Sequence, residues 1–181
     1  EAKKVLVTLA DGTTNTITDK TRQSVDDEDF SSAVYSKADL VFNGSGTLNV
    51  NAGYRNGIKS TDDLKVVSGT FNITSNEDGI IGKDLLGIKD GKFTIKSGSD
   101  GMKSTYDTDT SKGNIVITGG EFDITASNDG VHCNGDILIS GGNLTISSGD
   151  DGVHADDNLQ VDGGTIAIKK CCEGLEGVQI T

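Results

Sequence analysis

The sequence predicts an all-β fold, a right-handed three-sided parallel β-helix, from a fixed repeat and from alternating strands within each repeat. The repeat is marked by an acid or amide followed by glycine, at Asn56-Gly57, Asp78-Gly79, Asp100-Gly101, Asp129-Gly130, Asp151-Gly152 and Glu173-Gly174. These glycines are 22, 22, 29, 22 and 22 residues apart. Such a period is typical of a solenoid in which one unit stacks on copies of itself.

Each repeat contains two short runs in which apolar and polar residues alternate. Phe71-x-Ile73 follows a glycine turn, and Leu64-x-Val66 closes the preceding repeat. Alternation predicts strands with one face in the core. A single apolar residue after each acid-Gly pair, such as Ile80, supplies a third inward segment. Each unit therefore has three sides, and the right-handed sense follows from the preference of parallel crossover connections.

Two regions are expected along the chain. Residues 1–32 are predicted to form an N-terminal cap, in which Val5–Leu9 and Thr14–Thr18 read as a β-hairpin and an acidic loop follows. Residues 33–181 are predicted to form the β-helix, which we expect to continue further in the natural protein because the last repeat is incomplete. The longest repeat interval contains an insertion within residues 105–112, which we expect to stand out from one edge.

Composition narrows the possible partners. The net charge is −12, with 16 basic and 28 acidic residues, which argues against nucleic acid because phosphate binding needs a basic face. No apolar run reaches the roughly 18 residues of a membrane span. The three cysteines match neither a disulfide framework nor a zinc site. We expect Cys133 to be a small buried or turn residue, and Cys171 and Cys172 to be free thiols or a vicinal or intermolecular disulfide.

The recurring acids predict a metal site. Equivalent residues stack about 4.8 Å apart in a parallel β-helix, and neighbouring carboxylates at that spacing repel by roughly 1 kcal/mol even in water. A hard cation turns this repulsion into shared ligation, and calcium accepts oxygen ligands in loose geometry. We therefore expect calcium as the cofactor. The predicted metal ligands are Asp78, Asp100, Asp107, Asp109, Asn128, Asp129, Asp150, Asp151 and Glu173. The alternative is that Asp-Gly pairs only build turns, with glycine supplying a positive φ.

A second column of residues should face outward. His132 and His154 occupy equivalent positions there, and a histidine pair could bind a transition metal, but no third ligand type repeats with it. The sequence therefore favours a solvent-facing ladder whose mixed composition suits a sugar-facing surface. The candidate carbohydrate-binding residues are Tyr35, Tyr54, Lys59, Lys103, Tyr106, His132 and His154.

Several strings resemble a known bacterial surface family. They are Val34-Tyr35-Ser36-Lys37-Ala38-Asp39-Leu40, Asn43-Gly44-Ser45-Gly46-Thr47-Leu48, Asn56-Gly57-Ile58-Lys59-Ser60, Glu173-Gly174-Leu175-Glu176-Gly177 and the repeated Gly-Gly-x-Phe-x-Ile and Asp-Gly-Val-His units. The family is the calcium-binding, polysaccharide-lyase-like β-helix family, known as carbohydrate-binding domains. The resemblance implies calcium between turns and binding to cellulose-like or acidic polysaccharides at the cell surface.

The chain also resembles the family 9 pectate lyases, whose calcium site uses an Asp-Asp-Gly-x-Asp motif. Asp150 and Asp151 match this motif, but His154 stands where the last Asp belongs. The lyase base, a lysine about two coils further on, would fall beyond Thr181. Lys59 and Lys103 are the only candidate bases in the repeat column, and both lie on the other side of the acidic cluster.

The sequence thus predicts a non-catalytic, extracellular, calcium-binding module that recognises polysaccharide. One alternative is a calcium-dependent, pectate-type polysaccharide lyase. Another is a structural or adhesive cell-surface solenoid that stacks end to end.

Overall fold

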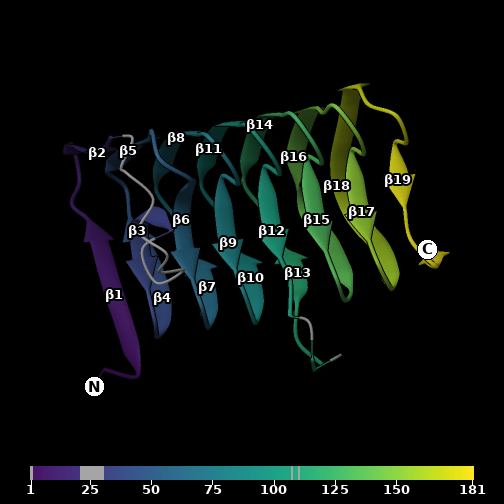
Figure 1. Cartoon of the computed structure of the whole chain (residues 1–181), viewed down its shortest axis with the longest axis horizontal. Coiled ribbons are helices and arrows are strands. Elements are labelled where there is room, and N and C mark those ends of the chain that lie inside the picture. Colours follow the sequence, from purple (N-terminus) through teal and green to yellow (C-terminus); the bar gives the residue numbers. More distant parts are fainter. Residues whose placement is uncertain (1, 21–30, 107, 110) are drawn as a thin grey trace.

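Short parallel strands follow one another along the long axis of the molecule, from the N-terminal to the C-terminal end (Figure 1). The computed structural model describes residues 2–20, 31–106, 108–109 and 111–181. Within these ranges the chain forms strands and turns and no helix. This stretch accordingly has no long apolar helix of the kind that crosses a membrane.

The strands form three parallel ladders. The first contains β1 (Lys4–Leu9), β4 (Asp39–Gly44), β7 (Asp63–Val66), β10 (Leu85–Ile88), β13 (Asn114–Ile117) and the first part of β16 (Ile137–Ser147). The second contains β2 (Thr14–Asp19), β5 (Thr47–Ala52), β8 (Thr70–Ser75), β11 (Lys92–Ser97), β14 (Glu121–Ala126) and the second part of β16. The third contains β3 (Ser32–Ser36), β6 (Asn56–Ser60), β9 (Ile80–Gly82), β12 (Met102–Ser104), β15 (Val131–Cys133), β17 (Val153–Ala155) and β19 (Leu175–Glu176).

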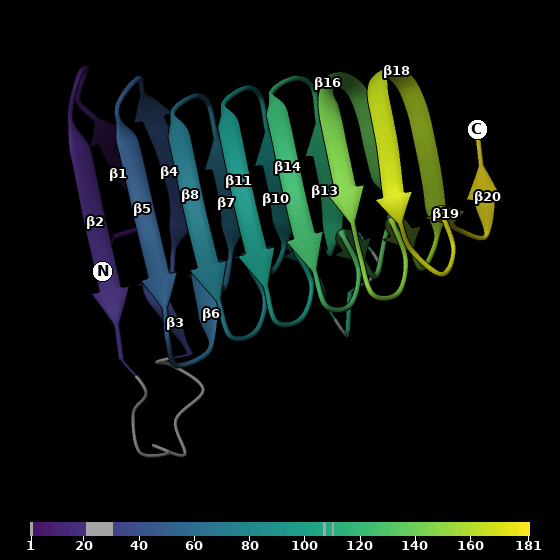
Figure 2. The same cartoon turned by 90° about the horizontal axis from the view of Figure 1, so that it is seen from above.

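The long strand β16 joins the first two ladders into one 13-stranded sheet, and the third ladder is a separate seven-stranded sheet. The remaining strands, β18 (Asn158–Lys170) and β20 (Gln179–Ile180), extend the 13-stranded sheet beyond β16. Figure 2 shows the second ladder side by side from β2 to β18. The predicted all-β, parallel architecture is confirmed. Its handedness stays a prediction.

The predicted N-terminal hairpin is wrong. β1 pairs with β4 and β2 pairs with β5, both in parallel, so the two strands add to different ladders. In these pairs Val7 lies beside Phe42, and Ile17 lies beside Val50. The physical reason is that alternation marks a strand and its buried face but not its partner. The acidic loop predicted after these strands lies mainly in residues 21–30, outside the described residues.

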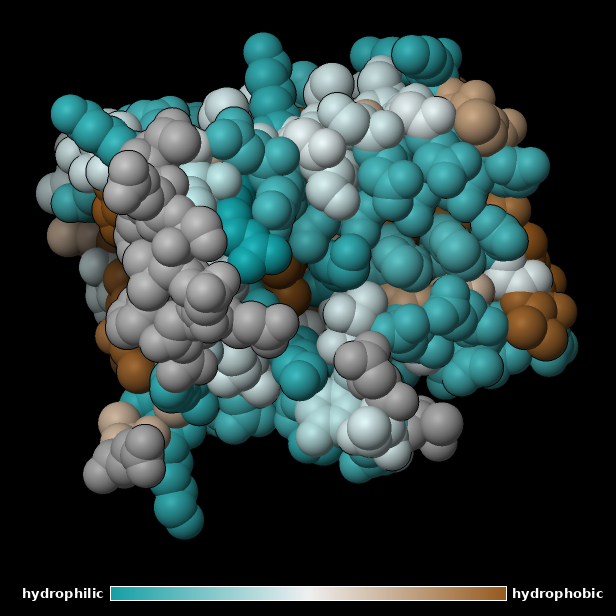
Figure 3. Space-filling model, viewed as in Figure 1, coloured by the Kyte–Doolittle hydropathy of each residue, from teal (hydrophilic) through white to brown (hydrophobic). Residues whose placement is uncertain are grey.

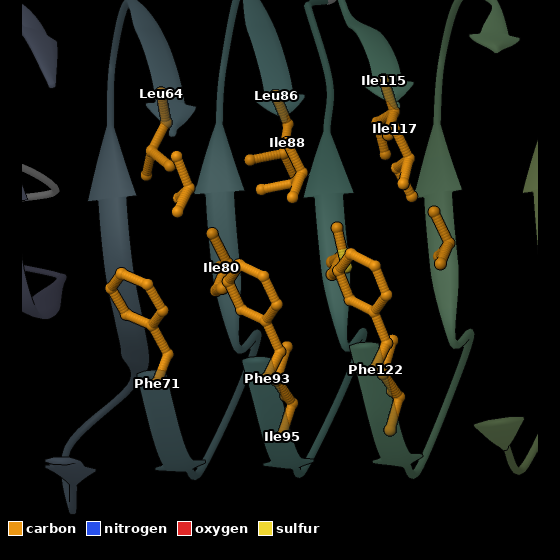
Figure 4. Packing of buried hydrophobic residues seen from close by; sticks show 14 of the residues in the cluster. Leu64, Phe71, Ile80, Leu86, Ile88, Phe93, Ile95, Ile115, Ile117 and Phe122 are labelled. Carbon is orange, nitrogen blue, oxygen red and sulfur yellow. The ribbon is translucent and has the colours of Figure 1, made fainter. Parts of the chain in front are cut away.

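The core is built from columns of equivalent apolar residues. Phe71, Phe93 and Phe122 lie on successive strands of the second ladder, and each is at most 3% exposed (Figure 4). Their ring centroids are 5.1 and 4.9 Å apart in stacked pairs, and Phe42 meets Phe71 edge-on at 5.5 Å. Phe71, Phe93 and Phe122 therefore stack on their equivalents in the adjacent repeats, and Phe42 on β4 closes the N-terminal end of this stack.

The glycines of the first five acid-Gly pairs are needed because the repeats pack closely there, whereas Gly174 has no close contact. A Cβ atom on Gly79 would lie 2.4 Å from the carbonyl oxygen of Gly101 and 2.6 Å from Cγ2 of Ile95. None of the acid-Gly glycines has a positive φ; such angles occur in the turns before the second-ladder strands, as at Gly69 and Gly91. The interpretation in which glycine supplies a positive φ at the acid-Gly pairs is therefore wrong, since steric contact between repeats explains them.

Candidate functional site

The repeated acids lie at the entry to the seven-stranded sheet and form a hydrogen-bonded column. We call Asn56, Asp78, Asp100, Asp129, Asp151 and Glu173 the acid column. In each of the first five members, Oδ1 accepts the backbone N–H of the next member, at distances of 3.0, 3.0, 3.2, 2.9 and 3.2 Å in chain order. One side-chain oxygen of each residue thus ties two repeats together. Asparagine can do this as well as aspartate, so this contact does not explain the preference for acids.

A column of basic side chains faces the second carboxylate oxygens. Three residues after each acid, β12, β15 and β17 present Lys103, His132 and His154 in register. Lys103 Nζ lies 2.6 Å from Asp100 Oδ2 and 3.7 Å from Asp78 Oδ2. Asp78 and Asp100 therefore already have a cationic partner within the protein.

The two histidines lie between the acid column and a further carboxylate. His132 Nδ1 is 3.4 Å from Asp100 Oδ2 and 3.7 Å from Asp129 Oδ2. His154 Nδ1 is 3.7 Å from Asp129 Oδ2 and 3.5 Å from Asp151 Oδ2. The rings stack with centroids 4.8 Å apart, and their side chains are only 18% and 23% exposed. They are therefore packed against the acids rather than forming the expected solvent-facing ladder.

Electrostatic conditions differ along the acid column. Burial raises the pKa of Asp100, but hydrogen bonds from His132, Lys103 and Asn128 outweigh it and hold that pKa well below its ordinary value. Burial raises the pKa of Asp129 above its ordinary value. The hydrogen bond to Asp100 raises the pKa of His132. Asp129 is thus the buried acid with the weaker cationic compensation.

Part of the predicted metal site comes together. Asp129, Asp150 and Asp151 each place one carboxylate oxygen within 4.8 Å of the other two. Asp150 also lies within that distance of Cys172 and Glu173. These oxygens are donors of the kind that calcium prefers.

Other predicted ligands have different surroundings. Asn128 donates from Nδ2 to Asp100 Oδ1 at 2.7 Å. Asp109 is exposed and accepts hydrogen bonds from the backbone and hydroxyl of Ser111. Asp107 lies outside the described residues. The structure therefore groups the C-terminal members of the predicted set and leaves Asp109 among the residues of its own turn.

A groove of about 1370 Å³ lies over the N-terminal half of the seven-stranded sheet. We call it the basic groove because its described lining contains six basic residues and four acids, whereas the chain has 16 and 28. The basic residues are Lys3, Lys37, Arg55, Lys59, Lys83 and Lys103. Figure 3 shows hydrophilic side chains over much of the C-terminal half of the same face. The groove thus reverses the charge balance of the whole chain.

The groove contains part of the predicted carbohydrate-binding set. Tyr35, Lys59 and Lys103 line it, and register pairing places His132 and His154 further along the same column. Two tyrosines lie elsewhere among the described residues. Tyr106, in the insertion, packs between Lys83 Nζ and Lys112 Nζ, 5.0 and 4.6 Å from its ring centroid. Tyr54 donates its backbone N–H to Asp19.

Sequence reasoning missed a parallel column two residues further on. Lys37, Lys83 and Asp156 belong to it, and each directly follows a strand of the seven-stranded sheet. Lys37 and Lys83 line the basic groove. Asp156 Oδ1 lies 3.3 Å from His154 Nε2 and 3.7 Å from His132 Nε2. Their equivalent places in the repeat were the signal that could have found these residues.

The chain was compared with known proteins. A family model described as carbohydrate-binding domain-containing protein matches residues 1–149 and 127–177. A protein of that description from Acetivibrio thermocellus is 36% identical over 75 residues, which cover 40% of this chain and 26% of that protein's length. A solved structure of the polysaccharide lyase-like protein from C. thermocellum, a gadolinium derivative, has a TM-score of 0.79 and 29% identity. That match covers 97% of this chain and 68% of the other.

Proposed function

Because the chain belongs to the family of carbohydrate-binding domain-containing proteins, we propose that it binds an acidic polysaccharide outside the cell without cleaving it. The observation that carries this proposal is the basic groove, which gathers lysine and arginine on a chain of net charge −12. A polyanion is repelled by most of such a surface. It is attracted where the cations are concentrated.

The groove has the chemistry to bind sugar carboxylates. The lysines offer point charges that reach an anion from several directions, and Arg55, whose Nε donates to Glu77, adds a planar guanidinium group. Lys59 and Lys103 lie two strands apart in one column, so cations recur along the direction in which the repeats stack. A polymer with a regular row of carboxylates can follow that direction.

The aromatic content of the groove favours an acidic glycan over a cellulose-like one. Flat neutral sugars are bound largely by stacking on aromatic rings, whose broad faces supply apolar contact area. Among the described residues that line the groove, only Tyr35 is aromatic. Charge is therefore the main recognition chemistry that this surface can offer.

Calcium is the proposed cofactor. Asp129, Asp150 and Asp151 would hold it, since their oxygens converge and form the donor set that fits a hard cation. When bound, calcium would neutralise the acids and offer a coordination position to a sugar carboxylate. Glu173, near Asp150, is a further candidate oxygen donor.

Lyase activity is the second candidate because a similar solved structure is described as polysaccharide lyase-like. Such a reaction needs a base that is free to accept a proton. Burial lowers the pKa of Lys103, but the hydrogen bond to Asp100 and the nearby acids outweigh it, and the net shift is upward. Lys103 therefore keeps its proton at neutral pH, which favours binding over cleavage.

A screen of immobilised glycans, run with calcium and with chelator, tests the proposal. We expect retention on polygalacturonate and other uronate polymers, stronger with calcium, and little on cellulose. Incubation with polygalacturonate and calcium should release no unsaturated, ultraviolet-absorbing product. Retention on neutral glycans alone would contradict the choice of ligand, and product formation would contradict the non-catalytic role.

A further inference from the structure

Two imidazole nitrogens and one buried carboxylate oxygen meet beside the acid column. His132 Nδ1 and His154 Nδ1 each lie 3.7 Å from Asp129 Oδ2, and all three atoms are within 4.8 Å of one another. Asp129 is 3% exposed. Its Oδ1 accepts the N–H of Asp151, while its Oδ2 has no hydrogen bond from any described residue within 3.5 Å. This oxygen is therefore available to a ligand between the two rings.

Asp156 orients both rings for such a ligand. Its Oδ1 faces the Nε2 atoms of His132 and His154, at 3.7 and 3.3 Å, and its Oδ2 accepts a hydrogen bond from Asn134 Nδ2 at 2.7 Å. A carboxylate at Nε2 favours the proton on that nitrogen in the metal-bound state, which leaves the lone pair on Nδ1. In His132, the bound metal would then replace the proton that Nδ1 shares with Asp100 Oδ2, 3.4 Å away. Both lone pairs are then on the side of Asp129, as in the carboxylate–histidine–metal arrangement of metal sites.

We propose that Asp129, His132 and His154 form a binding site for a divalent transition metal ion of the zinc class, which shares Asp129 with the proposed calcium site and adds two nitrogen ligands that calcium does not favour. Asp156 holds the two rings from behind. Asp151 Oδ2, 3.5 Å from His154 Nδ1, is placed to be a fourth ligand. The third ligand that the sequence did not reveal is Asp129, which belongs to the acid column rather than to the column of the histidines.

The donor set selects the kind of metal. Imidazole nitrogen suits zinc, copper, nickel and iron, whereas calcium takes oxygen ligands. Zinc ligands lie about 2.0–2.2 Å from the ion, so ligand atoms in a tetrahedral site are about 3.3 Å apart. The 3.7 Å separations therefore need to shorten by a few tenths of an ångström. The stacked rings, 20° from parallel, must also tilt so that both lone pairs point at one ion.

The neighbouring repeat explains why the site is confined to these residues. In the preceding repeats Lys103 Nζ lies 2.6 Å from Asp100 Oδ2, so an ammonium group takes the place that a metal would occupy. In the following repeat Glu176 stands in register with His154. Only His132 and His154 therefore offer two adjacent imidazoles to one buried carboxylate, and the chain has no further histidine.

The proposal is tested by titrating the full chain, freed of metal, with Zn²⁺ in a calorimeter. Cys172 with Asp150 and Glu173 is a rival zinc-binding group, so the parent protein carries Cys171→Ser and Cys172→Ser. We expect one zinc per chain, at least tenfold weaker binding in His132→Gln and in His154→Gln, and about 10–100-fold weaker binding in Asp156→Asn. Asp123→Asn, an exposed acid on β14, should bind zinc as the parent does.

A second measurement does not depend on the variants folding. Because the chain has two histidines, their imidazole nitrogens can be followed individually by NMR. Zinc should shift Nδ1 of both rings and leave the proton on Nε2, and an excess of calcium should not reverse the shift. Zinc affinity within twofold of the parent in both histidine variants would overturn the proposal, as would unchanged Nδ1 signals.

Discussion

The two oxygens of each column aspartate have different roles. Oδ1 accepts the N–H of the next repeat, and Oδ2 meets a basic side chain: Lys103 for Asp100, and the histidines for Asp129. The first role is structural and is met by Asn56 as well. The second role requires a negative charge, so it is the one that connects the column to ligand binding.

Substitutions at Asp129 can separate these two roles. In metal-free protein, Asp129→Ala should lower the free energy of unfolding by about 1–3 kcal/mol because the buried N–H of Asp151 loses its acceptor. Asp129→Asn keeps an acceptor and removes a buried charge, so at neutral pH it should be at least as stable as the wild type. Urea unfolding in the presence of chelator measures the free energy of unfolding of both variants and of the wild type. Equal losses in the two variants would contradict the structural role of Oδ1.

The same pair of proteins gives a pH dependence. Burial raises the pKa of Asp129 in the folded state, so folding favours its protonated form. The stabilisation of the folded state that results is fully present at pH values below the pKa of Asp129 in the unfolded state. It is lost as pH rises through the pKa of Asp129 in the folded state. The stability of wild type relative to Asp129→Asn should therefore fall as pH rises above about 4. Unfolding curves of both proteins from pH 3 to 7 would show this, and a constant difference would contradict it.

The cysteines give a residue-scale test of burial. Cys133 is buried, and burial raises the pKa of its thiol to about 12, whereas Cys172 is exposed and Cys171 is intermediate. Since the thiolate is the reactive form, iodoacetamide at pH 8 should modify Cys171 and Cys172 and spare Cys133 until the protein is unfolded. Peptide mass spectrometry locates the modified residues. Modification of Cys133 in the folded protein would contradict its place in the core.

At the scale of the element, the acid-Gly turn is limited by the distance between repeats. Gly79→Ala should destabilise the protein by about 1–3 kcal/mol, because its Cβ would overlap Gly101 and Ile95. Gly87→Ala is the matched control on β10, where the nearest atom to a Cβ is Cγ of Lys65, 3.4 Å away. Thermal unfolding should show a clear loss for the first variant only. A tolerated Gly79→Ala would mean that the repeats can separate without cost.

The period of the sequence predicts register well because equivalent residues pair directly, as Phe71 does with Phe93. The site is less predictable. The repeat spacing places the acids in a column. It does not say which carboxylate oxygen accepts the backbone N–H of the next repeat, or that Lys103 donates a hydrogen bond to Asp100. Side-chain direction and hydrogen-bond competition decide these contacts. The partners of β1 and β2 were missed for a related reason, since alternation does not name the neighbouring strand.

At the scale of the whole molecule, the chain separates its charges along one sheet. The basic groove lies over the N-terminal half of the seven-stranded sheet, and the histidines and C-terminal acids lie further along it. An acidic polymer in the groove could continue toward cations bound by those acids. This arrangement links the proposed ligand and the proposed calcium on one face.

Calcium should therefore stabilise the whole fold. A ligand at 100 times its Kd adds about 2.7 kcal/mol to the free energy of unfolding. Adding calcium to metal-free protein should raise Tm, and the combined Asp150→Asn, Asp151→Asn variant should lose most of that gain. Asp123→Asn, an exposed acid on β14 that belongs to none of the described groups of converging ligand atoms, serves as the control. An unchanged Tm with calcium would contradict the proposed cofactor.

The most direct test of acidic-polysaccharide binding is the affinity for oligogalacturonate of a variant that lacks groove cations. In Lys59→Gln, Lys83→Gln the loss of two charges should weaken binding about tenfold or more, which corresponds to about 1.4 kcal/mol. The control, Lys96→Gln, Lys169→Gln, removes two exposed lysines outside the lining of the groove and should bind within twofold of the wild type. Titration calorimetry on folded proteins of matched Tm measures the affinity of each variant for oligogalacturonate. Equal affinity of the two variants would contradict the central claim.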